Sequence, residues 1–144
     1  AALIPVLLEV LKNLGSKHVL IVAAEDGLDE ISIAAPTSVG ELKDGEIAHF
    51  SVSPSDFGME TYANYHSLQI SSPEESLAML RDALSNTNKA AADIVALNAG
   101  AAIYVAGKAE SLVAGVQKAK AILVTGDAMT KLEKLIQFSN SLAT

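Results

Sequence analysis

The sequence predicts an α/β fold with a helix-rich second half, and three observations predict this class. A helical pattern over residues 3–14 precedes an unbroken apolar run over residues 19–24, and a helix followed by a buried strand is typical of α/β proteins. Residues 31–53 hold short apolar segments separated by turn residues, which favours further strands. Residues 72–144 carry only helix signals, so the predicted strands lie in the first half.

The first element is predicted to be a helix, because apolar residues recur three and four positions apart. These residues are Leu3, Leu7, Val10, Leu11 and Leu14. Gly15 follows them and can adopt the left-handed conformation that ends many helices. Residues 19–24 contain no polar side chain, so we expect a strand covered on both faces, as in a parallel sheet.

Short strands are predicted next, at residues 31–34 and 46–52, with residues 39–42 as a third candidate. The sequence Lys43-Asp44-Gly45 predicts a turn before the second of these strands. Residues 53–71 have several turn residues and little periodicity, so we expect a surface loop there.

The second half begins with a helix start at Ser72-Pro73, where Glu75 completes the pattern of a capping box. Leu77, Leu80 and Leu84 line one face of this helix. Residues 90–105 are apolar on almost every side, which indicates a buried helix that ends before Gly107. A last helical stretch begins near residue 110, with its apolar stripe at residues 112, 116, 119 and 123, and is interrupted at Gly126.

The chain of 144 residues is long enough to bury a core without disulfides, and it contains no cysteine. We expect a single α/β domain over residues 1–144. The strands are too few for a complete doubly wound sheet, so we expect the remaining strands to precede Ala1. The longest stretch without a charge, residues 94–107, is too short to cross a bilayer, and we expect no membrane contact and a cytoplasmic location.

The net charge of −7 lies entirely in residues 1–72, which hold 10 acidic and 3 basic side chains. Four carboxylates fall within six positions, at Glu25, Asp26, Asp29 and Glu30. Such a cluster repels a phosphate backbone, so direct nucleic-acid binding is not expected.

The same carboxylates follow a predicted buried strand, where open α/β sheets bind their ligands. Paired carboxylates suit Mg²⁺, which often links one or two of them to a substrate phosphate. A solvated surface loop is the alternative, and the residues alone favour it, because carboxylate clusters in loops are more often solvated surface. Asn98 lies inside the apolar helix and could reach a ligand, but we expect it to bond a neighbouring backbone group, as buried asparagines commonly do.

Several segments together resemble the C-terminal portion of the anthranilate phosphoribosyltransferase family, in its order and spacing. They are Leu14-Gly15-Ser16-Lys17-His18, Asp26-Gly27-Leu28-Asp29-Glu30, Pro36-Thr37, Glu41-Leu42-Lys43-Asp44-Gly45-Glu46 and Leu97-Asn98-Ala99-Gly100-Ala101-Ala102. The similarity covers essentially the whole chain, and its most specific element is the run over residues 26–30.

The resemblance implies a sheet-and-helix phosphoribosyltransferase domain of the nucleoside phosphorylase type. It implies transfer of the phosphoribosyl group from phosphoribosyl pyrophosphate to anthranilate, giving phosphoribosyl anthranilate and pyrophosphate in tryptophan biosynthesis. It also implies Mg²⁺ at Asp29 and Glu30, no catalytic side chain in this chain, and a homodimer of the full-length protein.

The sequence departs from the family at Ala23-Ala24, where a His and a small residue are usual. The family's Gly-rich pyrophosphate loop, its substrate-binding residues and its helical domain are expected upstream of Ala1, so we expect the isolated chain to be inactive. Two alternatives stay open: a relative of pyrimidine nucleoside phosphorylase, which shares the architecture, and a non-catalytic α/β binding domain whose acidic loop is only solvated.

Overall fold

The computed structural model describes residues 1–142, which form five α-helices, two short 3₁₀ helices and one three-stranded sheet. The α-helices are α1 (Ile4–Asn13), α2 (Pro73–Leu84), α3 (Lys89–Val105), α4 (Leu112–Thr125) and α5 (Asp127–Ser141). The strands are β1 (His18–Ala24), β2 (Thr37–Lys43) and β3 (Glu46–Val52), and the 3₁₀ helices are η1 (Pro54–Phe57) and η2 (His66–Leu68). The predicted α/β class with a helical second half is confirmed.

The sheet is antiparallel, in the order β1-β2-β3. The turn predicted between β2 and β3 is present, and both of its central residues have positive φ, +51° at Asp44 and +87° at Gly45, as the tightest hairpin turns require. The expectation of a parallel sheet around β1 is wrong for the described residues, because β1 pairs with β2 in the antiparallel sense. The connection over residues 25–36 contains no crossover helix, so the chain returns in the opposite direction.

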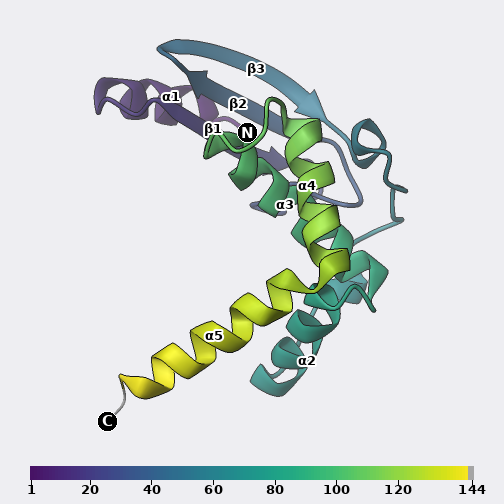
Figure 1. Cartoon of the computed structure of the whole chain (residues 1–144). Coiled ribbons are helices and arrows are strands. Elements are labelled where there is room, and N and C mark those ends of the chain that lie inside the picture. The colour runs from purple at the N-terminus through teal and green to yellow at the C-terminus, as the bar shows by residue number, and fades with distance from the viewer. Residues whose placement is uncertain (143–144) are drawn as a thin grey trace.

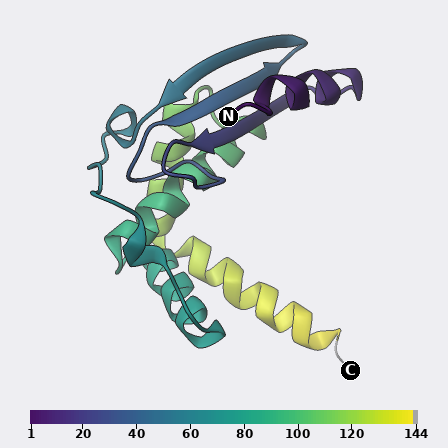
Figure 2. The same ribbon diagram turned by 180° about the vertical axis from the view of Figure 1, so that it is seen from behind.

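Both faces of β1 are covered, as its apolar sequence predicts. Val19, Ile21 and Ala23 pack toward α1, whereas Leu20 and Val22 pack toward the core under α3. Figures 1 and 2 show α1, α3 and α4 gathered around the sheet, with α2 and α5 extending away from it. A continuous run of apolar residues thus indicates that both faces of a strand are covered. It does not indicate whether the neighbouring strand is parallel or antiparallel.

The helix α1 contacts the sheet through Ile4 and Leu8, which are almost fully buried. They lie over Gly40 of β2, where an added β-carbon would stand 2.6 Å from Leu8 Cδ1. The apolar residues that indicate the helix in the sequence lie mostly on its other side, and Leu3 and Leu14 are 69% and 76% exposed. The close approach at Gly40 therefore selects which of two apolar faces is buried.

The strand predicted at residues 31–34 is absent from the described structure. The backbone of Ile31 bonds the side chain of Asn98, and the N–H of Ser32 donates to Thr37 Oγ1, so side chains replace a strand partner. The strand predicted at residues 46–52 has the predicted bounds, and the candidate at residues 39–42 lies within β2. The predicted loop over residues 53–71 contains η1 and η2.

The helices of the second half begin and end close to the predicted positions. Ser72 Oγ accepts a hydrogen bond from the N–H of Glu75 at 3.1 Å, but the Glu75 carboxylate accepts from the N–H of Ser71 and not of Ser72, so the capping box is only half right. The prediction of a buried helix over residues 90–105 is confirmed by α3, where Leu97 is fully buried. Gly126, with φ +78°, separates α4 from α5 as predicted.

The predicted apolar stripe of α4 is buried. The predicted stripe of α2 is more exposed, since Leu77 and Leu80 are 46% and 40% exposed, and in α5 the apolar side chain of Phe138 is 63% exposed. No helix within residues 1–142 is long and apolar enough to cross a membrane.

Candidate functional site

The candidate site is the acidic loop, residues 25–36, which follows β1. Backbone bonds close its base: the N–H of Ala24 donates to the carbonyl of Leu28 at 3.1 Å, and the N–H of Glu25 donates to the carbonyl of Pro36 at 2.9 Å. Gly27 has φ +93° and allows the tight turn at the end of the strand. The loop is therefore held to the ends of the two strands that it connects.

The four carboxylates of the loop have different surroundings. Asp26 Oδ2 accepts a hydrogen bond from Ser32 Oγ at 2.5 Å, and Asp26 Oδ1 accepts one from the N–H of Leu28 at 3.3 Å. Glu25 and Asp29 are exposed, and Glu30 is half-buried. Asp26 thus holds the loop together, which leaves Asp29 and Glu30 as the adjacent pair that can take a ligand.

Asp29 and Glu30 have the chemistry of an incomplete cation site. Burial raises the pKa of the Glu30 carboxyl, and the negative charge of Asp29 raises it further. A bound cation would offset both effects. Within residues 1–142 no group of three or more His, Asp or Glu side chains is placed to hold a metal, so the loop supplies at most two carboxylates to one ion. Mg²⁺ accepts such a site, because it retains several waters or phosphate oxygens as its other ligands.

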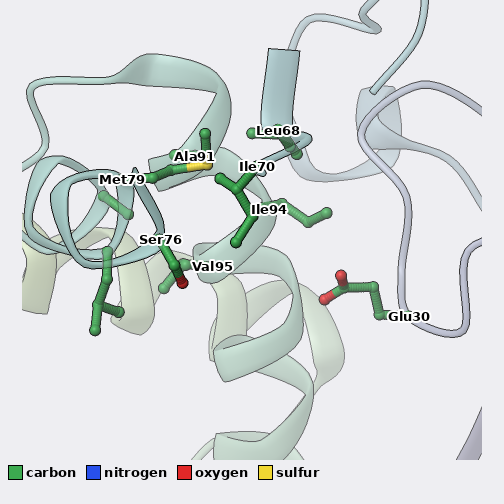
Figure 3. Close-up of a pocket in the computed structure, with 10 residues that line it drawn as sticks. Glu30, Leu68, Ile70, Ser76, Met79, Ala91, Ile94 and Val95 are labelled. Atoms are coloured by element: carbon green, nitrogen blue, oxygen red, sulfur yellow. The ribbon is translucent and has the colours of Figure 1, made fainter. Parts of the chain in front are cut away.

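Glu30 borders a cavity of about 270 Å³ between the loop and the helices α2 and α3. Figure 3 shows its carboxylate pointing toward a space walled on the far side by the apolar side chains of Ile70, Met79 and Ile94. Among the described residues that line this cavity, Glu30 alone carries a charge. The apolar surroundings explain why burial is the main cause of its raised pKa.

Asn98 of α3 bonds backbone groups of the acidic loop and of its own helix. Asn98 Oδ1 accepts from the N–H of Ile31 at 2.9 Å, and Asn98 Nδ2 donates to the carbonyl of Ile31 at 3.0 Å. Nδ2 also donates to the carbonyl of Ile94 in its own helix at 3.0 Å. The prediction that Asn98 bonds backbone groups is confirmed, but the sequence did not reveal that its partner follows Glu30 directly.

Ser32 and Thr37 form a second tie within the loop that sequence reasoning missed. Both are fully buried, and the N–H of Ser32 donates to Thr37 Oγ1 at 3.1 Å. The hydroxyl of Ser32 donates to Asp26 and accepts from the N–H of Ala34 at 2.9 Å. The available signal was the presence of hydroxyl residues in an otherwise apolar segment, which need a partner when buried.

A separate polar cluster lies at the start of β1, away from the acidic loop. His18 Nε2 lies 2.8 Å from Glu41 Oε1, and the hydroxyl of Tyr104 donates to the same oxygen at 2.7 Å. These bonds connect both β1 and α3 to β2 at the end of the sheet opposite the candidate site.

The chain is similar to known proteins over nearly its whole length. Residues 1–129 match the family model described as "Glycosyl transferase family, a/b domain". The anthranilate phosphoribosyltransferase of Nitrosomonas europaea is 50% identical over 143 residues, which are 99% of this chain and 42% of that protein. The chain therefore spans about two fifths of the length of this curated relative.

Solved structures give the same result. The crystal structure of anthranilate phosphoribosyltransferase from Thermus thermophilus matches with a TM-score of 0.85 and 33% identity, over 95% of this chain and 40% of that one. A variant of the Saccharomyces cerevisiae anthranilate phosphoribosyltransferase with Mg bound matches with a TM-score of 0.73 and 25% identity, over 86% of this chain and 36% of that one. The resemblance drawn from the sequence segments is confirmed.

Proposed function

Because this chain belongs to the glycosyl transferase family with the a/b domain, we propose that the protein containing it transfers a phosphoribosyl group to anthranilate. The donor is phosphoribosyl pyrophosphate, and the products are phosphoribosyl anthranilate and pyrophosphate, a step of tryptophan biosynthesis. The observation that supports this most is the 50% identity to a protein named anthranilate phosphoribosyltransferase across nearly the whole chain. The activity is proposed for the full-length protein, since this chain spans only part of that relative.

The proposal places Mg²⁺ at Asp29 and Glu30. Two adjacent carboxylates, one of them half-buried and repelled by the other, fit a hard divalent cation that completes its shell with water and phosphate oxygens. A related structure from Saccharomyces cerevisiae has Mg bound. When bound, the ion would orient the pyrophosphate and neutralise the negative charge that develops as it leaves.

The residues of this chain then act by position and charge. Asp29 and Glu30 bind and orient, and neither is proposed to act as a general base. Asp26, Ser32 and Asn98 keep the loop in one conformation through the bonds described above. The proposal assigns no substrate-binding residue within residues 1–144.

The homodimer and the cytoplasmic location remain predictions.

The two alternative functions have less support. A nucleoside phosphorylase relative rests on shared architecture alone, and a non-catalytic domain leaves the position of the acidic pair at the end of β1 without a role. We therefore retain the transferase as the single proposal.

The test measures anthranilate consumption by its fluorescence, with phosphoribosyl pyrophosphate and Mg²⁺, using the full-length protein. Asp29→Asn and Glu30→Gln should each lower kcat at least tenfold, because each removes one anionic ligand of the ion. Glu25→Gln is the matched control, since it removes an exposed carboxylate of the same loop that lies outside the pair. A folded protein that leaves anthranilate untouched would overturn the proposal.

A further inference from the structure

We infer that Asn98 is a positioning residue for Glu30: its carboxamide fixes the peptide group that joins Glu30 to Ile31, and thereby sets the direction of the acidic pair. This inference rests on the proposed role of Asp29 and Glu30 in binding Mg²⁺. It concerns a residue that lies on another element, 67 positions from its partner in the sequence.

The hydrogen bonds reach the relevant peptide. The N–H of Ile31 belongs to the peptide plane that begins at the carbonyl carbon of Glu30, and Asn98 Oδ1 holds that N–H at 2.9 Å. Asn98 Nδ2 holds the carbonyl of Ile31 at 3.0 Å. Two bonds from one planar carboxamide restrict both peptide planes that flank Ile31, much as a neighbouring strand would.

The anchor for these bonds is rigid. Asn98 lies between Leu97, which is fully buried, and the contact of α3 with α4 at Gly100. Its own side chain is fixed by the bond from Nδ2 to the carbonyl of Ile94. Ile31 is itself 1% exposed, so packing in the core also holds in place the residue that follows Glu30.

The other ties of the acidic loop act elsewhere. The backbone bonds at its base involve residues 24–28 and 36, the bonds of Ser32 involve Asp26, Ala34 and Thr37, and the N–H of Tyr62 donates to the carbonyl of Ile33 at 3.0 Å, beyond Ile31. Asp29 and Glu30 lie between the bonds at the base of the loop and the bonds of Ser32. Asn98 bonds Ile31, the residue that directly follows this acidic pair. A residue that orients a metal-binding carboxylate commonly changes metal affinity by about 10- to 100-fold when it is removed.

The experiment measures Mn²⁺ binding by electron paramagnetic resonance in the full-length protein, with phosphoribosyl pyrophosphate present and anthranilate absent, so that no turnover occurs. Asn98→Ala should raise the Mn²⁺ dissociation constant about tenfold. Hydrogen exchange at the amide of Ile31 should become faster in the same variant. Asn98→Ser is the second variant, for use if the alanine variant folds poorly: its hydroxyl can keep a hydrogen bond to the carbonyl of Ile94, but a single short hydroxyl cannot replace both bonds of the carboxamide to Ile31.

Tyr104→Phe is the matched control, since it removes the bond to Glu41 from the same helix at the far end of the sheet. It should lower the melting temperature and leave Mn²⁺ affinity unchanged. The inference would be overturned if Tyr104→Phe lost as much Mn²⁺ affinity as the Asn98 variants. It would also be overturned if both Asn98 variants kept the wild-type Mn²⁺ affinity although the Ile31 amide exchanged faster. Either result would leave the proposed function standing. A wild-type protein that binds no Mn²⁺ would overturn the proposed metal site and this inference together.

Discussion

Gly100 of α3 lies against Val116 of α4 so closely that a β-carbon on Gly100 would stand 2.5 Å from the Cα of Val116. Since a real β-carbon essentially never comes that near to backbone, the two helices must separate in a Gly100→Ala variant. We expect the substitution to lower the free energy of unfolding by about 1–3 kcal/mol, the usual cost of overpacking a core. The measurement is urea unfolding of the full-length protein.

The direction of this effect is diagnostic, because replacing glycine by alanine in an open helix stabilises it by about 1 kcal/mol. Ala102→Gly, at an exposed position of α3, is the control for helix propensity. It should destabilise by about that amount. A stabilising Gly100→Ala would mean that the two helices do not pack at this distance.

Glu75 gives a pH-dependent contribution to stability at the start of α2. The hydroxyl and the N–H of Ser71 donate to its carboxylate at 2.7 and 2.8 Å, and they hold the pKa of Glu75 below its ordinary value of 4.5. A lowered pKa in the folded state adds stability that is fully present above pH 4.5 and is lost as pH falls through the folded value.

We therefore expect Glu75→Gln to lower the melting temperature at pH 7, and we expect its difference from the wild type to shrink steadily as the pH falls below 4.5. Glu74→Gln, in the same helical turn, controls for the loss of negative charge at a helix N-terminus. The prediction fails if the difference between Glu75→Gln and the wild type is as large at the acid end as at pH 7.

Asp26 should contribute to the stability of the protein, whereas Asp29 should contribute to metal binding and hardly to stability. Asp26→Ala leaves the fully buried hydroxyl of Ser32 without its acceptor, so we expect a loss of about 1–3 kcal/mol in the free energy of unfolding. Asp29→Ala removes an exposed carboxylate and should change stability by no more than about 0.5 kcal/mol. Denaturant unfolding without divalent ions measures both losses, and equal losses would show that the loop depends no more on Asp26 than on Asp29.

Elements with local signals could be predicted from the sequence. The cap at Ser72, the break at Gly126 and the hairpin turn at Asp44-Gly45 each depend on a few adjacent residues, and the structure confirms all three. The bounds of β3 were predictable for the same reason, because a turn precedes the strand and a proline follows it.

Features that depend on distant contacts could not be predicted in this way. Residues 31–34 resemble a strand because their apolar pattern does not reveal that Asn98 bonds the backbone in place of a neighbouring strand. The buried face of α1 is the one that packs closely against Gly40 of β2. The apolar pattern of α1 contains no information about that strand. The local residue pattern does not distinguish Asp26 from Asp29, whereas the hydrogen bonds that Asp26 accepts from Ser32 and Leu28 do.

The isolated 144-residue chain should show no phosphoribosyl transfer. The acidic pair offers two carboxylates, and no larger group of metal-binding His, Asp or Glu side chains is found within residues 1–142, whereas a bound phosphoribosyl pyrophosphate needs donors for its phosphate oxygens. The curated relative that it matches over 143 residues is more than twice its length, so those donors are expected outside this chain. The measurement compares anthranilate fluorescence with the purified chain and with the full-length protein at equal concentration. Activity in the full-length protein alone is the expected result, and transfer by the isolated chain would mean that residues 1–144 contain a complete site.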